Sequence, residues 1–415
     1  MSWLSLTPGR VSAIKHRRLA LLITLMAGLV LLPPLASSDR TTPSTEIPFE
    51  KHMLDLGFSE TAAVADVNRD GRLDIISGEN WFEQAPPPAK KGGKSRWIKH
   101  KFRDLGYSMF YQDNLSDLAI DVNGDGYPDI ASCSWWSKAL TWWENPGASR
   151  QPWREHLIAT GSPVEFAFLV DILNTGKPLQ LLPQFGDEKF PLTWYEAVGK
   201  GAAAQWVKHE ISSKSYGHGI GAGDVNQDGR TDIITPKGWF EAPPDPRIGP
   251  WIFHPEFDLG VTGFIYPLDV NGDGLVDLVT SAAHNYGIFW YEQKKTPSGE
   301  RTWEKHLIDE SWSQAHAVTI VDLNGDGHPD LVTGKRYMAH NGHDPGEREP
   351  LGIYWYEMIK VQGKLEWVRH VIDYSTRAGG GVQIPVVDID GDGDLDFVVG
   401  GKSGLFLFEN LSAQK

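Results

Sequence analysis

A nine-residue acidic pattern occurs six times in this chain. Each copy reads Asp-x-(Asn or Asp)-x-Asp-Gly-x-x-Asp. The copies start at Asp66, Asp121, Asp224, Asp269, Asp322 and Asp388. Oxygen donors at positions 1, 3, 5 and 9, a backbone carbonyl at position 7 and glycine at position 6 can wrap a loop around one hard cation. Calcium accepts six to eight oxygens at flexible distances, whereas magnesium requires a stricter octahedron, so the pattern predicts six calcium sites.

Positions 1, 3, 5, 7 and 9 of each copy supply the predicted ligands. They are Asp66, Asn68, Asp70, Arg72, Asp74, Asp121, Asn123, Asp125, Tyr127, Asp129, Asp224, Asn226, Asp228, Arg230, Asp232, Asp269, Asn271, Asp273, Leu275, Asp277, Asp322, Asn324, Asp326, His328, Asp330, Asp388, Asp390, Asp392, Asp394 and Asp396. A seventh copy starts at Asp171 but has Leu173, Thr175 and Leu179 at ligand positions, so we expect no ion there. No copy has the Glu at position 12 that an EF-hand requires.

Two aromatic series alternate with the acidic loops in a constant order. One is an aromatic strand that ends in Glu, as in Trp81 to Glu83, and the other has an aromatic residue three positions before a histidine, as in Trp97 and His100. Each series has seven members, and apolar and polar residues alternate between them as they do in strands. Four short strands in about 50 residues, repeated seven times, predict an all-β fold, a seven-bladed β-propeller with four strands per blade.

The chain begins with one histidine element, Phe49 to Met53, and ends without one. We therefore expect the N-terminal strand to complete the last blade. Such closure leaves no open sheet edge where the ring meets itself.

These loops between strands resemble the FG-GAP/VCBS repeat family, whose calcium-bearing blades also build the head of integrin α-subunits. The resemblance covers residues 45–415 and implies a seven-bladed propeller with one calcium between the first two strands of each intact blade. A weaker and local resemblance links residues 334–346, GKRYMAHNGHDPG, to the propeller of aldos-2-ulose dehydratases, which are sugar enzymes. The cupin domains of that second family are not found in this sequence.

The first 38 residues are typical of an export signal. Four basic residues precede 17 uncharged ones, Leu19 to Leu35, and small residues at 36–38 suit cleavage. The apolar run is short for a membrane span and contains Pro33 and Pro34. We therefore expect a signal peptide over residues 1–38, the propeller over residues 39–415, and a secreted, periplasmic or cell-surface protein.

The composition limits the partners. The formal net charge of −15 at pH 7 argues against nucleic acid and anionic membranes, and no membrane insertion is expected after signal cleavage. Cys133 is the single cysteine, so no internal disulfide can form and bound calcium would fix the loops instead. We expect a monomer that binds a carbohydrate or extracellular glycan, with a protein partner as the alternative.

Residues that break the repeat are the candidates for function. Seven of the 14 histidines belong to the repeated histidine strands and are expected to be structural. The chain has five others outside the acidic loops and the first 38 residues, which are His218, His284, His316, His340 and His343. His218 and His316 lie six residues before the first Asp of an acidic loop, as do Glu60 and Glu165. Because each loop follows the first strand of its blade, these positions should lie around the axis on the opposite face.

The second strand of each blade should end at the same face. The predicted ligand-binding residues are Glu60, Glu79, Asn80, Trp135, Trp136, Glu165, Lys237, His284, Asn285, Tyr337 and Lys402. The predicted catalytic residues are His218, His316, Lys335, Arg336, His340 and His343. The longest repeat inserts residues 336–350, which can fold over this mouth. We expect His316 and Arg336 to be partly exposed, so that the fold does not depend on them.

Two functions of different classes remain open. The first is an enzyme that eliminates or dehydrates beside the carbonyl of a sugar or uronate, with His218 or His316 as the base and Lys335 and Arg336 stabilising the enolate. An additional divalent metal, held by His218, His316 and Glu60 or Glu165, could polarise the carbonyl instead.

The second is a non-catalytic module that binds a glycan or a protein at the cell surface. Trp135, Trp136 and Tyr337 could then form a platform for sugar rings. The sequence has no Ser-His-Asp signature, P-loop or dinucleotide fingerprint, which argues against hydrolase, nucleotide-binding and redox functions.

Overall fold

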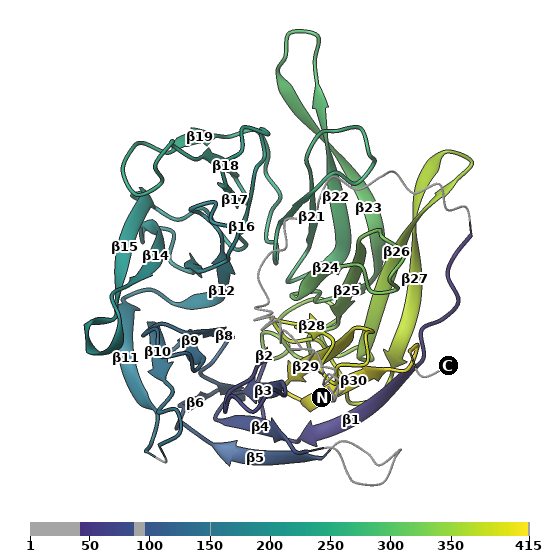
Figure 1. Cartoon of the computed structure of the whole chain (residues 1–415). Coiled ribbons are helices and arrows are strands. Elements are labelled where there is room, and N and C mark those ends of the chain that lie inside the picture. The colour runs from purple at the N-terminus through teal and green to yellow at the C-terminus, as the bar shows by residue number, and fades with distance from the viewer. Residues whose placement is uncertain (1–41, 87–95, 150, 414–415) are drawn as a thin grey trace, which may run out of the picture.

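The computed structural model describes residues 42–86, 96–149 and 151–413. Within these segments, seven four-stranded antiparallel sheets are arranged around a central axis (Figure 1), together with one two-stranded hairpin. One turn of 3₁₀ helix, Gly201–Ala203, is the only helix in the described segments. The predicted all-β, seven-bladed propeller with four strands per blade is confirmed. The predicted signal peptide lies outside the described residues.

Strands are numbered along the chain, and each blade is listed from its innermost strand outward. Blade 1 consists of β2 (Ala63–Ala65), β3 (Asp74–Ser77), β4 (Asn80–Gln84) and β5 (Trp97–Lys101). Blade 2 consists of β8 (Ser116–Ile120), β9 (Asp129–Cys133), β10 (Ala139–Glu144) and β11 (Arg154–Thr160). Blade 3 consists of β12 (Val164–Val170), β13 (Gln180–Phe185), β14 (Leu192–Val198) and β15 (Gln205–Ser212). Blade 4 consists of β16 (Gly221–Gly223), β17 (Asp232–Thr235), β18 (Gly238–Glu241) and β19 (Ile252–His254).

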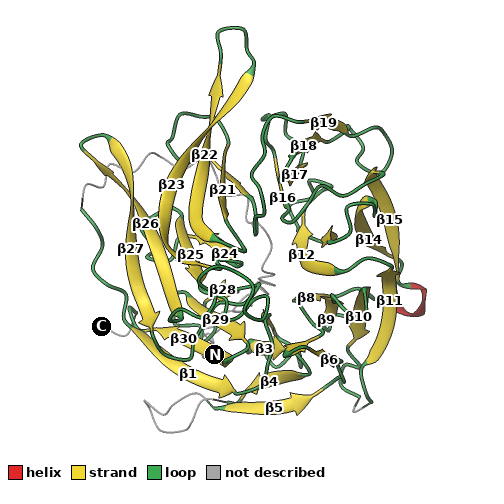
Figure 2. Ribbon diagram, turned by 180° about the vertical axis from the view of Figure 1, so that it is seen from behind, coloured by secondary structure: helices red, strands yellow, loops and turns green. Residues whose placement is uncertain are grey.

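The remaining blades follow the same plan. Blade 5 consists of β20 (Tyr266–Leu268), β21 (Asp277–Ser281), β22 (Tyr286–Lys295) and β23 (Arg301–Ser313). Blade 6 consists of β24 (Val318–Val321), β25 (Asp330–Gly334), β26 (Gly352–Val361) and β27 (Lys364–Tyr374). Blade 7 consists of β28 (Val386–Val387), β29 (Asp396–Gly401), β30 (Gly404–Asn410) and, from the other end of the chain, β1 (Phe49–Asp55). The hairpins β22–β23 and β26–β27 project outward from the ring (Figure 2).

The N-terminal strand closes the ring, as predicted. β1 pairs antiparallel with β30, from Phe49 opposite Asn410 to Asp55 opposite Leu405. Figure 1 shows the purple β1 beside the yellow C-terminal blade. The first and last strands of the described chain, β1 and β30, are therefore hydrogen-bonded to each other in one sheet.

The repeated aromatic residues and histidines build the outer part of each blade. In blade 1, Trp81 lies opposite His100 in the strand register, and their rings stack with centroids 4.3 Å apart. Nε2 of His100 lies 2.8 Å from a carboxylate oxygen of Glu83, on the strand that carries Trp81. The same stacking recurs in blades 2 to 6, with centroids 4.1–4.3 Å apart. These histidines thus tie the third strand to the fourth.

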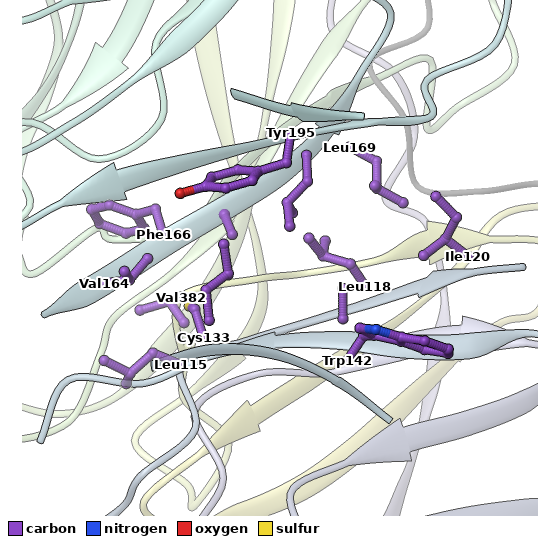
Figure 3. Close-up of a cluster of buried hydrophobic side chains, with 14 of the residues drawn as sticks. Leu115, Leu118, Ile120, Cys133, Trp142, Val164, Phe166, Leu169, Tyr195 and Val382 are labelled. Carbon is purple, nitrogen blue, oxygen red and sulfur yellow. The ribbon is translucent and has the colours of Figure 1, made fainter. Parts of the chain in front are cut away.

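The hydrophobic core lies between neighbouring blades. Figure 3 shows the cluster between blades 2 and 3, where Leu118 and Ile120 of β8 face Leu169 of β12. Cys133 is buried in this cluster. Near the axis the innermost strands approach so closely that a Cβ on Gly221 would lie 1.9 Å from the carbonyl oxygen of Ile265. A glycine there permits the close contact between blades 4 and 5. No helix of the described segments is long and apolar enough to cross a membrane.

Candidate functional site

The residues that break the repeat come together around the axis. Glu165 lies on β12, while Glu60, His218 and His316 precede β2, β16 and β24. Arg336 follows β25 by two residues. The start of an innermost strand and the end of a second strand therefore meet at one face, which is where the topology predicts them.

Arg336 joins two of the predicted ligand-binding carboxylates. Its Nε and Nη2 donate to the two carboxylate oxygens of Glu60 at 2.9 and 2.8 Å, and its Nη1 donates to Oε1 of Glu165 at 2.7 Å. Arg336 is only 1% exposed, and Glu60 and Glu165 are each 3% exposed. Burial alone would lower the pKa of Arg336, but Glu60 and Glu165 outweigh it and raise that pKa above its ordinary value.

The expectation that Arg336 and His316 are partly exposed is wrong. Both side chains are buried. Three of the five guanidinium N–H groups donate to these two carboxylates, and the side chain is shielded from solvent. Arg336 therefore holds the site together rather than contacting a ligand directly.

Three histidines surround Glu165. Nε2 of His218 lies 2.8 Å from Oε2 of Glu165, and Nε2 of His316 lies 3.8 Å from Oε1. The His284 ring lies 4.4 Å from that of His218 and 5.0 Å from that of His316, centroid to centroid. Burial and the neighbouring His218 lower the pKa of His284 to about 3, so this ring is neutral at physiological pH.

The insertion 336–350 folds against this group. The His340 ring packs edge-to-face on His284 with centroids 4.1 Å apart, and its Nδ1 donates to Asp344 at 2.8 Å. His343 is exposed. Nζ of Lys335 donates to Oγ of Ser313 at 2.8 Å and lies 3.5 Å from Glu349.

Aromatic side chains line one side of the same face. The rings of Tyr111 and Trp136 lie 4.8 Å apart, and Nζ of Lys402 lies 3.5 Å above Tyr111. Lys402 also donates to the carbonyl oxygen of Met338 in the insertion. Backbone N–H groups of Trp135 and Trp136 donate to Asp113 at 3.0 Å, which fixes this turn.

The sequence analysis missed Tyr111 and the hairpin that holds it. The hairpin consists of β6 (Tyr107–Ser108) and β7 (Tyr111–Gln112). Its tip residues Met109 and Phe110 both have positive φ, 49° and 69°, and Phe110 is 74% exposed. The hairpin falls outside the four strands of its blade, so a search for deviations in the aligned repeats would have identified it.

A pocket of about 370 Å³ adjoins the histidines at blade 5. Its lining includes His284, Asn285, Tyr286, Phe289 and Lys305. Nζ of Lys305 lies 3.6 Å from the centre of the Phe289 ring. The pocket thus joins an aromatic wall and a cation to the edge of the histidine group.

Several predicted ligand-binding residues lie apart from this group. Lys237 is half-exposed and pairs with Asp258 at 2.7 Å. Glu79 accepts a hydrogen bond from the backbone N–H of Leu105 at 2.9 Å, and Asn80 begins β4. Tyr337 is exposed at the start of the insertion.

The acidic loops lie at the other end of the innermost strands. In blade 1, the carboxylate of Asp66 accepts the N–H groups of Asp70 and Gly71, both at 2.9 Å. The matching pairs recur in the other five intact loops. Gly71 has φ of 87°, a left-handed conformation that glycine adopts without strain.

The donors of these loops suit a calcium ion. In blade 7, oxygens of Asp388, Asp390 and Asp396 lie within 4.8 Å of one another. Oδ1 of Asp394 is buried and has no hydrogen-bond partner among the described residues. Burial and the neighbouring Asp392 raise the pKa of Asp390 to about 6, which a divalent cation would reverse.

The third loop keeps the turn but not the donors. Asp171 accepts the N–H groups of Thr175 and Gly176 at 2.8 and 2.6 Å. Leu173 and Leu179 offer no side-chain oxygen. The loop can therefore fold without an ion.

Residues 269–333 match the family model of the FG-GAP-like repeat. This segment runs from the acidic loop of blade 5 into that of blade 6, so it covers one repeat period. This part of the seven-bladed propeller therefore matches an FG-GAP-like repeat. No curated protein matches the chain.

Solved structures with similarity to this propeller are distant. A lectin of Agrocybe aegerita, whose structure concerns recognition of non-reducing terminal N-acetylglucosamine, has 14% identity and a TM-score of 0.45, over 88% of this chain and 86% of the lectin. The V. cholerae biofilm matrix protein Bap1 has 11% identity and a TM-score of 0.41, over 92% of this chain and 91% of Bap1. A putative oxidoreductase (glucose dehydrogenase) of Thermus thermophilus has 11% identity and a TM-score of 0.36, over 72% of this chain and 98% of that protein. Similarity at this level is no guide to function.

Proposed function

We propose that the protein is an exported, calcium-loaded propeller that binds a carbohydrate at its axial face and eliminates water from it beside a carbonyl group. The observation that carries this proposal is the pair His340 and Asp344, which the insertion holds against His284. Asp344 accepts a hydrogen bond from Nδ1 of His340, so Nε2 keeps a lone pair for a proton. A histidine oriented by a carboxylate in this way is suited to act as a general base.

The surroundings favour a sugar or a uronate. Sugars offer many hydroxyl groups and apolar ring faces, so their sites combine polar groups with aromatic walls. This face supplies Tyr111 and Trp136 on one side and Phe289 and Tyr286 on the other. A pocket of about 370 Å³ is within the size range of small-molecule sites.

The proposed reaction needs one base and one acid. Nε2 of His340 takes the proton from the carbon beside the carbonyl, and that electron pair forms the new C=C bond. The hydroxyl on the next carbon leaves as water after it receives a proton. Burial lowers the pKa of Lys402 to about 8, although Glu60 opposes this effect, so Lys402 is our candidate for the acid.

Calcium has a separate role in this proposal. Six ions in the acidic loops would neutralise clustered carboxylates at the face opposite the site. They would fix the turns between the first two strands of six blades, and the reaction itself would not use them.

The test is turnover of keto-sugars and uronates by purified protein, followed by the ultraviolet absorbance of the conjugated product. His340→Gln should lower kcat at least about 100-fold, as expected for the loss of a general base. His343→Gln is the matched control in the same insertion and should retain activity. Equal activity of the two variants would contradict the role of His340.

A non-catalytic glycan-binding module is the second candidate, and the exposed hairpin tip favours it. Met109 and Phe110 are held in left-handed conformations at the edge of the axial face, where they can contact a large ligand. Retention on immobilised glycans that Phe110→Ala abolishes, without any product from the same glycans, would favour this candidate over the enzyme.

A further inference from the structure

Four side chains from four different blades form a compact group near the axis. Glu165 comes from β12 of blade 3, His218 precedes β16, His284 follows β21, and His316 precedes β24. One ligand atom from each, three imidazole nitrogens and one carboxylate oxygen, lie within 4.8 Å of one another. Two groups bound to one zinc-sized ion at 2.0–2.2 Å lie roughly 3 Å apart, so small side-chain shifts would complete a coordination shell.

The hydrogen bonds of His218 are compatible with a metal cation beside Nε2. Its Nδ1 lies 2.7 Å from the carbonyl oxygen of Thr262, which can only accept, so Nδ1 carries the proton. Its Nε2 faces Oε2 of Glu165 at 2.8 Å, and an ionised carboxylate also only accepts. A second proton on Nε2 would satisfy this contact, and so would a metal ion that binds both Nε2 and Oε2. A backbone carbonyl on Nδ1 is also the contact that usually orients a metal-binding histidine.

His316 and His284 have lone pairs with no other use. Both ring nitrogens of the fully buried His316, and Nε2 of His284, find no hydrogen-bond partner in the described part of the chain. The ring of His316 lies 5.0 Å from that of His284 and 6.1 Å from that of His218, centroid to centroid, so its nitrogens lie beside the other ligand atoms. Neutral imidazole is the form that binds metals.

The charges around the group favour a divalent ion. Arg336 carries one positive charge between two buried carboxylates, so the second carboxylate is balanced by another cation nearby, such as Lys402 or a bound ion. Both oxygens of Glu60 accept from Arg336, so Glu60 is not available as a ligand. Glu165 shares only Oε1 with Arg336 and keeps Oε2 for the ion.

We propose that Glu165, His218, His284 and His316 bind one divalent transition-metal ion of the zinc class, distinct from the calcium ions of the acidic loops. Three imidazoles and one carboxylate suit zinc, cobalt or iron, whereas calcium takes oxygen ligands almost exclusively. His284, which the sequence analysis assigned to ligand binding, becomes the third histidine of this centre. Arg336 and Glu60 orient Glu165 from outside the shell.

The experiment is a cobalt(II) titration of the full-length protein, stripped with a chelator and refilled with excess calcium so that the acidic loops are occupied. Wild type should bind one cobalt ion with visible absorption bands that zinc abolishes. His284→Ala, at a half-buried position, should weaken cobalt binding at least about tenfold, since even the loss of a residue that only orients a ligand costs about 10 to 100-fold.

His306→Ala is the matched control. His306 pairs with Glu292 at 2.8 Å in an outer strand, beside Glu304, so it tests whether any acidic histidine site binds cobalt. Cobalt binding unchanged in His306→Ala and lost in His284→Ala and His218→Ala would support the centre. The proposal would be overturned if wild type bound no stoichiometric cobalt. It would also be overturned if His306→Ala weakened cobalt binding as much as His284→Ala does. Loss in His340→Gln but not in His218→Ala would also overturn it, because the ion would then lie between His284, His340 and Asp344.

This inference concerns the same face as the proposed function but does not require it. A carbonyl oxygen bound to such an ion would be polarised, which is the contribution a metal makes to an elimination. Cobalt binding is measured without any substrate, so a metal centre without sugar turnover, and turnover without a metal centre, are distinguishable results.

Discussion

At the scale of single residues, the most consequential contact is the buried ion pair of Arg336 with Glu60 and Glu165. Removing one partner of such a group leaves charge that neither water nor another side chain compensates. We expect Arg336→Ala to lower the free energy of unfolding by about 3–5 kcal/mol, measured by urea denaturation with calcium present.

Lys237→Ala is the control for that measurement. Lys237 pairs with Asp258 at the surface, and exposed pairs contribute about 0–1 kcal/mol. An Arg336 variant as stable as the Lys237 variant would show that the axial carboxylates are hydrated or protonated rather than paired.

Lys402 gives a prediction about pH. A lysine that donates a proton works only while it is protonated, and burial lowers the pKa of this one to about 8. We therefore expect kcat/KM for the elimination to fall as pH rises above about 8. Lys402→Arg should lower the rate, because a guanidinium gives up its proton poorly, and should move this fall to higher pH, because it stays protonated. A basic limb that does not move in Lys402→Arg would assign it to another group.

At the scale of elements, the seven acidic loops provide an internal comparison. Six have the full donor pattern, and the loop from Asp171 keeps the turn with two leucines in donor positions. We expect Asp66→Ala to lower the calcium stoichiometry by one ion and to reduce the melting temperature. Asp171→Ala should leave the stoichiometry unchanged, and isothermal titration calorimetry can measure both. Loss of an ion from the Asp171 variant would show that the third loop binds calcium.

Elements were easier to predict from this sequence than contacts were. Period-two alternation and three interleaved series are properties of single blades, so strand number, loop position and ring closure could be predicted. The position of Glu60, Glu165, His218 and His316 before their acidic loops also placed them at one face. The pairing of Arg336 with two carboxylates depends on side chains from blades 1, 3 and 6, and no local pattern contains that information.

The same reason explains the missed aromatic residues. Tyr111 belongs to a hairpin outside the repeat, and only the folded ring brings it to Lys402 of blade 7. Lys237 follows the second strand of blade 4 as Arg336 follows the second strand of blade 6. The side chain of Lys237 nevertheless pairs with Asp258 at the surface. Strand position alone could not separate these two outcomes.

At the scale of the whole molecule, function depends on ring closure, because the axial site takes residues from several blades. Glu60 lies just after β1, the strand that completes blade 7, and Arg336 lies in blade 6. Any opening between the first and last blades would therefore separate Arg336 from Glu60. This coupling makes the N-terminal strand important for the site as well as for stability.

We expect a chain that starts at Leu56 to lose both the intact axial site and part of its stability. Deletion of β1 exposes the hydrogen-bonding edge of β30, which invites association with other chains. It also removes the edge contact between Phe49 and Phe397, at 5.2 Å, which contributes about 1 kcal/mol beyond its buried area. The control is a chain that starts at Thr42 and retains β1. Size-exclusion chromatography and thermal melting should show aggregation and a lower melting temperature for the shorter chain alone. A monomer of unchanged stability that starts at Leu56 would mean that β30 can close the ring without β1.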